Sequence, residues 1–124
     1  MFEKLKKIPV VENLRISSDG AIMLMDLDDR TARGYLCSLS LVLAIFIDRL
    51  DNFPLETVRY ITLLLAASPD IHDHSLQLIP EGGWLCCYYE KNMSGEKIAT
   101  EIEKQLALTR YLANVIVSQK KCRV

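Results

Sequence analysis

The alternation of apolar and polar positions predicts a β-hairpin in the first quarter of the chain. Residues 10–16 can form a first strand and residues 21–27 the returning strand. The intervening Ser17-Ser18-Asp19-Gly20 contains an Asp-Gly pair, which favours a tight hairpin turn. The returning strand is apolar on both faces, with Ile22 and Leu24 on one and Met23 and Met25 on the other. Such a strand is expected inside a sheet or beneath a partner.

Alternation continues after a second turn signal, Asp28-Asp29-Arg30. Apolar residues recur at every second position over 35–41, which predicts a third, half-buried strand. The next stretch, 41–50, fits either an extension of that strand or the start of a helix, so the pattern leaves both open.

The pattern then changes to helical spacing. Asp51-Asn52-Phe53-Pro54 is typical of a helix start, and Pro69 is expected to end a helix running to about Ala67. Its buried stripe would be Val58, Ile61 and Leu65.

A second hairpin and a long helix are predicted to close the chain. Strands at 75–79 and 84–89 are joined by a turn at 80–83, and Ser94 is placed to cap a helix over 95–117. In the second of these strands, Trp84, Cys86 and Tyr88 share one face, and Leu85, Cys87 and Tyr89 the other. The helix carries one apolar stripe at helical spacing, made of Ile98, Ile102, Leu106, Thr109, Ala113 and Ile116.

The start of the chain predicts a short amphipathic helix over Met1–Ile8, because Phe2, Leu5 and Ile8 recur every three residues before Pro9. The expected order is therefore α-βββ-α-ββ-α. An antiparallel sheet packed with helices in this order is an α+β fold, and we expect one domain over residues 1–124.

Composition narrows the function classes. The 124 residues carry a net charge of −1, which gives no electrostatic case for binding nucleic acid or an anionic membrane. The first eight residues are too charged for a signal peptide, and no apolar run approaches the roughly 20 residues of a membrane-spanning helix. We therefore expect a cytoplasmic protein with reduced cysteines.

Candidate chemistry is sparse. His72 and His74 could supply two metal ligands, with Cys86 or Cys87 as a third, but their spacing matches no zinc motif and a polar loop is the better interpretation. No cysteine has a base beside it in the sequence, and Gly82-Gly83 lacks the rest of a phosphate loop. The sequence thus predicts no catalytic residue, no metal and no cofactor.

The remaining signal is a surplus of apolar residues, which form half of the chain. Methionine-rich surfaces suit adaptable binding of other proteins. The candidate binding residues near the N-terminus are Phe2, Leu5, Ile8, Met23 and Met25. Alternatively, these five residues are ordinary core.

The layout of the second half resembles the class I type III secretion chaperones, the family of the Tir chaperone. The resemblance rests on the helix 54–67, the strand 76–79, the turn Glu81-Gly82-Gly83-Trp84 leading into strand 85–89, and the long final helix over 95–117. Small family members that chaperone the secretion gatekeeper have a similar glycine-tryptophan-leucine turn. One departure is the short first helix, which Pro9 limits.

The resemblance implies a bacterial cytoplasmic chaperone without catalysis. It would bind the N-terminal region of a secreted effector or gatekeeper protein and keep that protein competent for secretion. It also implies a homodimer, or a heterodimer with a second chaperone. By analogy, the dimer contact would involve Val58, Leu65, Leu85 and Tyr89.

Two other functions stay open. The first is a non-secretory dimeric adaptor or regulator, of roadblock-like or sensory-regulator type. A roadblock-like order places a helix after two strands, so a helix over 35–41 would favour it. The second is a small enzyme or metal-binding protein that uses His72, His74 and the cysteines.

Overall fold

The computed structural model describes residues 1–71 and 73–122, so His72 lies outside the described residues, as do the side chains of Lys121 and Cys122. The chain folds into a six-stranded antiparallel sheet and three α-helices. In chain order the elements are α1 (Phe2–Lys6), β1 (Val11–Ile16), β2 (Ile22–Leu27), β3 (Arg30–Leu36), β4 (Ser40–Asp48), α2 (Leu55–Ala67), β5 (His74–Ile79), β6 (Gly82–Glu90) and α3 (Gly95–Cys122). This confirms the predicted α+β class.

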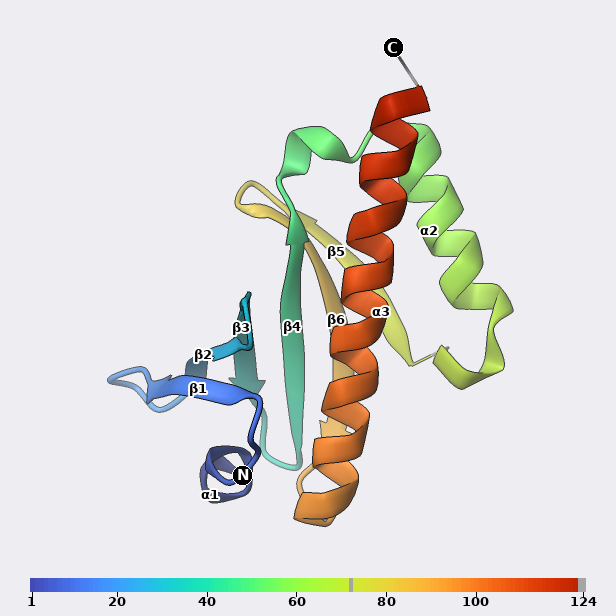
Figure 1. The fold of residues 1–124 in the computed structure, drawn as a ribbon. Coiled ribbons are helices and arrows are strands. Elements are labelled where there is room, and N and C mark those ends of the chain that lie inside the picture. The colour runs from blue at the N-terminus through green and yellow to red at the C-terminus, as the bar shows by residue number, and fades with distance from the viewer. Residues whose placement is uncertain (72, 123–124) are drawn as a thin grey trace.

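The strands lie in the order β1-β2-β3-β4-β6-β5, so β1 and β5 form the two edges. Figure 1 shows α3 lying along β4 and β6, with α1 near its start and α2 beside its second half. All three helices pack on the same face of the sheet, which we call the covered face. The other face has no helical layer among the described elements.

The turns before β2 and β3 form where the sequence predicts them, at residues that tolerate a positive φ. Gly20, in the first hairpin, adopts a φ of 74° that favours glycine, and Asp28, in the turn before β3, has a φ of 54°. Aspartate tolerates this left-handed conformation better than most residues. Both hairpins then bring their strands into antiparallel register.

The predicted single strand over 35–41 is wrong. The structure ends β3 at Leu36 and begins β4 at Ser40, and a turn closed by the Cys37 N–H donating to the Ser40 carbonyl (2.9 Å) separates them. Tyr35 and Leu41 consequently face opposite sides of the sheet. The ambiguous stretch 41–50 is mostly β4. The order is therefore α-ββββ-α-ββ-α, with one strand more than predicted and no helix where the roadblock-like alternative needed one.

The core lies between the sheet and α3. All six residues of the predicted α3 stripe are buried, and the Ser94 hydroxyl accepts a hydrogen bond from the Lys97 N–H (3.1 Å), which confirms the predicted cap. Ile61 and Leu65 of α2 are also buried, in a second cluster shared with α3 and β6. The α2 start differs slightly from the prediction, because a 3-10 turn at 50–52 precedes Pro54 and no side chain caps the helix.

Candidate protein-binding face

The face of the sheet opposite the helices is unusually apolar for a face without a helical layer. Its residues follow from the strand registers, since paired residues lie on the same face. We define the open face by Ile22, Leu24, Tyr35, Val42, Ala44, Phe46, Ile79, Trp84, Cys86 and Tyr88. Seven of these form an apolar cluster that contains no helical residue. A sheet face in contact with water normally carries polar side chains, so this face indicates a binding surface.

Side chains from β3, β4 and β6, together with Glu81 of the turn before β6, organise the open face. Trp84 is 3% exposed although no helix covers it, because neighbouring side chains enclose it. The Phe46 ring packs edge-on against the Trp84 ring, with 5.3 Å between the ring centres. The Arg33 guanidinium lies 4.6 Å from the centre of the Trp84 ring. Arg33 also forms an ion pair with Glu81 at 2.6 Å. These contacts hold a rigid aromatic group at one end of the open face, while Tyr88 stands 54% exposed on the same strand.

The residues predicted to bind an effector lie mainly inside the chain. Leu5, Ile8, Met23 and Met25 are buried in the core cluster beneath α3, and Phe2 packs against that cluster. Met23 and Met25 belong to the covered face of β2, and α1 folds over them. Leu5, Ile8, Met23 and Met25 are therefore core residues in this structure, and Phe2 is partly buried. Exposed apolar side chains occur on the open face, at Leu24 and Tyr88, and also on α2 and α3.

The residues predicted for a dimer contact are also interior. Leu65, Leu85 and Tyr89 are buried, and Val58 packs against the α2–α3 cluster. The Tyr89 hydroxyl donates to the buried Gln105 side chain at 2.7 Å, which fixes Tyr89 within the protomer. On α2 the accessible apolar side chains are instead Leu55, Tyr60 and Leu63.

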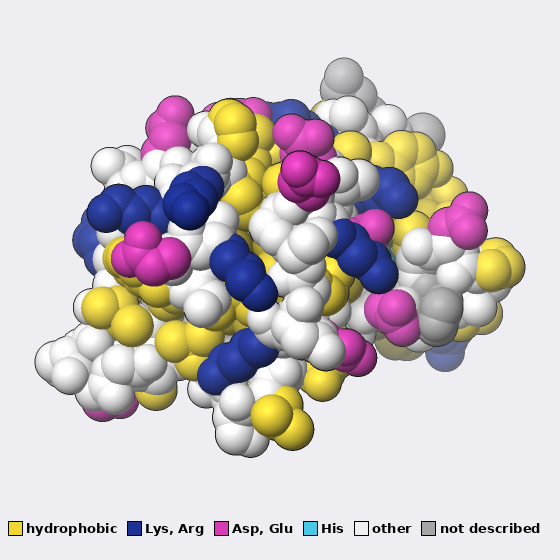
Figure 2. All heavy atoms as spheres, turned by 90° about the horizontal axis from the view of Figure 1, so that it is seen from below, with side chains coloured by type: hydrophobic (Ala, Val, Ile, Leu, Met, Phe, Trp, Pro, Cys, Tyr) yellow, Lys and Arg dark blue, Asp and Glu magenta, His cyan; other side chains and the backbone are white. Residues whose placement is uncertain are grey.

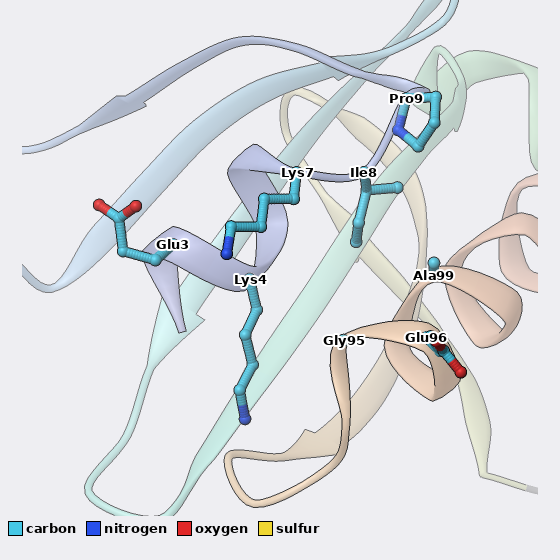
Figure 3. Close-up of a pocket in the computed structure, with 8 residues that line it drawn as sticks. All are labelled: Glu3, Lys4, Lys7, Ile8, Pro9, Gly95, Glu96 and Ala99. Carbon is cyan, nitrogen blue, oxygen red and sulfur yellow. The ribbon is translucent and has the colours of Figure 1, made fainter.

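A hollow lies between α1 and the start of α3. It has a volume of about 430 Å³, and Figure 3 shows Lys4, Lys7 and Ile8 from the α1 side facing Gly95, Glu96 and Ala99. Figure 2 views this end of the molecule, where basic, acidic and apolar side chains are interspersed. The Lys4 ammonium donates to the carbonyls of Lys91 (2.7 Å) and Met93 (2.8 Å). Lys4 therefore ties α1 to the turn before α3.

Replacing Lys4 by methionine should loosen α1. The change removes two charge-assisted hydrogen bonds but keeps most of the aliphatic stem, so we expect a loss of about 1–2 kcal/mol in the free energy of unfolding. Amide hydrogen exchange over residues 2–8 should accelerate. Lys6→Met is the matched control, because Lys6 is an exposed lysine on the same helix. Equal exchange rates in the two variants would contradict a stabilising role for the hydrogen bonds of Lys4.

A polar pocket of about 360 Å³ surrounds His74 on the covered side of the sheet. Its lining includes Asp73, Cys87 and Glu101. The His74 Nδ1 lies 3.2 Å from the Ile71 carbonyl, which can only accept, so Nδ1 carries the proton in the neutral ring. Burial lowers the pKa of His74 and raises the pKa of the Cys87 thiol to about 11. At neutral pH this pair is an uncharged imidazole and an uncharged thiol, so the thiol is not activated as a nucleophile.

Stability should fall as the pH drops from 7 to 5. Because the pKa of His74 is below its ordinary value in the folded state, the unfolded chain binds a proton there that the folded chain does not, and acid favours unfolding. Urea unfolding at both pH values measures the difference. The variant His74→Gln should show a smaller fall over the same range, and an undiminished fall in that variant would contradict the assignment to His74.

The hypothetical metal site depends in part on His72, which lies outside the described residues. Within residues 1–71 and 73–122, no three histidine, cysteine or acidic side chains are grouped so as to hold a metal ion. No described helix is both long and apolar enough to cross a membrane. Cys37 is exposed and Cys86 and Cys87 are buried, and all three are free thiols.

Sequence reasoning identified the alternation that builds the open face but not its role. The predicted separation of Trp84, Cys86 and Tyr88 from Leu85, Cys87 and Tyr89 is confirmed. The missing information was which side of the sheet the helices cover. The usable signal was that β6 is apolar on both of its faces, although the three helices cover only one of them.

Comparison with known proteins finds Salmonella relatives that match the chain over nearly its whole length. It is 42% identical over 121 residues to a SpiC homolog of Salmonella typhi, covering 98% of this chain and 95% of the relative. It is also 42% identical to Salmonella pathogenicity island 2 protein C of Salmonella typhimurium, covering 98% of this chain and 91% of the relative. No protein-family model matches the chain.

Proposed function

Because the chain belongs to the family of SpiC and Salmonella pathogenicity island 2 protein C, we propose that it is a type III secretion chaperone. In this proposal it binds the N-terminal region of a secreted effector or gatekeeper protein in the bacterial cytoplasm. It performs no catalysis and uses no cofactor. The order α2-β5-β6-α3 of the second half, the part that resembles class I secretion chaperones, supports the proposal.

The observation that carries the proposal is the open face. A sheet with three helices on one side and an apolar cluster on the other has surface that favours contact with another protein. Tyr88 and Leu24 are accessible on this face, and Tyr35, Val42 and Phe46 are partly accessible. A client segment that covers them buries its apolar side chains on the chaperone rather than in its own core. The client region then stays unfolded on its own and can be threaded for secretion.

Self-association, or pairing with a second chaperone, is part of the proposal. The accessible apolar side chains of α2 (Leu55, Tyr60 and Leu63) form a surface separate from the open face. A contact through this surface would leave the open face accessible to a client in each protomer. Such a contact replaces Val58, Leu65, Leu85 and Tyr89, which are engaged in the core.

Deletion of the gene in the native bacterium tests the proposed function. The amount of each secreted protein is measured by quantitative mass spectrometry in cells and in culture medium. We expect one or a few type III substrates to disappear from the medium, and their secretion to return when the chain is supplied from a plasmid. The same client should co-purify with the tagged chain. An unchanged set of secreted proteins would refute the chaperone role.

A further inference from the structure

Trp84 is almost completely buried on a face that has no helical layer among the described elements. Its side chain is 3% exposed, and it forms the buried part of the open-face cluster together with Ala44 and Cys86. Ala44 and Cys86 have short side chains that rise little above the sheet, so they cannot close over the outer side of an indole ring. A longer side chain must therefore do so.

The Arg33 guanidinium supplies this cover. Arg33 lies on the open face of β3, because it pairs with Ala44 of β4, and its guanidinium is placed over the Trp84 ring at 4.6 Å from the ring centre. The Phe46 ring also packs against Trp84, but it is an apolar group that water does not solvate well. The guanidinium is charged, and water solvates it once it leaves the ring. Arg33 is therefore the neighbour of Trp84 that is best able to move away.

An ion pair with Glu81 holds Arg33 over the ring. The guanidinium and carboxylate lie 2.6 Å apart, and the side chains of Arg33 and Glu81 are 29% and 59% exposed. Ion pairs and cation–π contacts at such exposed positions each favour the bound arrangement by roughly fivefold or less. Burial acts to lower the pKa of Arg33, but hydrogen bonds to Glu81 and Tyr35 outweigh it and raise that pKa, so the guanidinium stays charged. Salt, which screens the ion pair, should therefore loosen the cover.

The covered arrangement also leaves the indole N–H unpaired. Nε1 of Trp84 is buried and has no hydrogen-bond partner among the described residues. A buried donor without an acceptor disfavours the arrangement that buries it, by roughly fivefold or more. Motion that admits water to the ring relieves part of this cost. The unpaired N–H thus opposes the two contacts that hold Arg33 in place.

We propose that Arg33 is a displaceable cover for Trp84. In the closed position, which is the one in this structure, the guanidinium lies on the ring and is paired with Glu81. In the open position the ion pair is broken, the guanidinium is in water and the ring is accessible on the open face. The chain thereby hides its largest apolar side chain in one position and presents it as an aromatic anchor in the other. The cover works within this chain and does not depend on the proposed chaperone function.

Fluorescence quenching tests the cover directly, because Trp84 is the only tryptophan of the chain and its emission reports on this ring alone. Neutral acrylamide quenches an indole in proportion to its accessibility. We expect the quenching constant to rise about twofold or more in Glu81→Gln, and further in Arg33→Ala. Asp29→Asn is the matched control, because it breaks an ion pair of similar exposure, between Asp29 and Arg110, elsewhere on the molecule. This control should leave the quenching constant unchanged.

Salt gives a second test that needs no substitution. Raising the ionic strength from about 0.05 M to about 1 M should increase acrylamide quenching in the parent chain and not in Glu81→Gln. Equal quenching in Arg33→Ala and the parent would show that other side chains cover Trp84, and would overturn the proposal. Increased quenching in Arg33→Ala without a response to salt or to Glu81→Gln would show a fixed cover and would also overturn it. If Arg33→Ala does not fold, as judged by circular dichroism, the salt response and Glu81→Gln decide between the outcomes.

Discussion

Replacing Gly82 by alanine is expected to lower the free energy of unfolding by about 4 kcal/mol. Gly82 opens β6 with a φ of 143°, a conformation open essentially to glycine alone. A methyl group there would lie 2.5 Å from the Phe46 ring and 2.7 Å from the Asp48 carbonyl oxygen. Backbone strain and overpacking each cost about 1–3 kcal/mol, and the carbonyl cannot move without disturbing the end of β4.

The matched control is Gly20→Ala. Gly20 also has a positive φ, of 74°, but no atom lies within 4 Å of an added methyl group. This variant therefore measures backbone strain without the clash, and we expect a loss of about 1 kcal/mol. Chemical denaturation of the two variants against the parent chain gives the comparison. Equal losses would show that the close approach at Gly82 contributes nothing.

Replacing Gln105 by leucine should have the second largest effect, a loss of about 3 kcal/mol. Gln105 is fully buried on α3, and its amide donates to the carbonyls of Leu43 (2.9 Å) and Leu85 (3.0 Å). Its oxygen accepts from the Tyr89 hydroxyl. Leucine keeps the volume but leaves the buried hydroxyl without an acceptor and two carbonyls without this donor, and each unmade bond costs about 1–3 kcal/mol.

A double-mutant cycle with Tyr89→Phe isolates the side-chain pair. Because the hydrogen bond between Tyr89 and Gln105 is lost in each single variant, the double variant should lose less than the sum of the two. We expect a coupling of about 1 kcal/mol in chemical denaturation. Additive losses would contradict a direct stabilising bond between α3 and β6.

Local signals sufficed for most of the fold. The Asp19-Gly20 turn, the Ser94 cap and the spacing from Ile98 to Ile116 each encode a structure that depends on nearby residues only. The turn between β3 and β4 carried no such signal, because its residues, Cys37-Ser38-Leu39, include no glycine, proline or asparagine. The alternation of apolar and polar residues continues across residues 37–39, so it predicted one strand where the structure has two.

The site could not be located in the same way, because it depends on which face the helices cover. Met23 and Met25 have the apolar surface of a binding patch, but α1 and α3 pack over that face. Val42 and Tyr88 lie on the opposite face and remain accessible. Alternation assigns residues to two faces but does not say which of them the rest of the chain buries.

The most direct test of the open face as a client-binding surface is co-purification from the native bacterium with two matched charge variants. Tyr88 is 54% exposed on the open face and Val117 is 47% exposed on α3, so Tyr88→Glu and Val117→Glu introduce the same charge at similar exposure. We predict that Tyr88→Glu reduces the amount of secreted protein recovered at least tenfold and that Val117→Glu does not. Full recovery with Tyr88→Glu, or equal loss in both variants, would contradict binding through the open face.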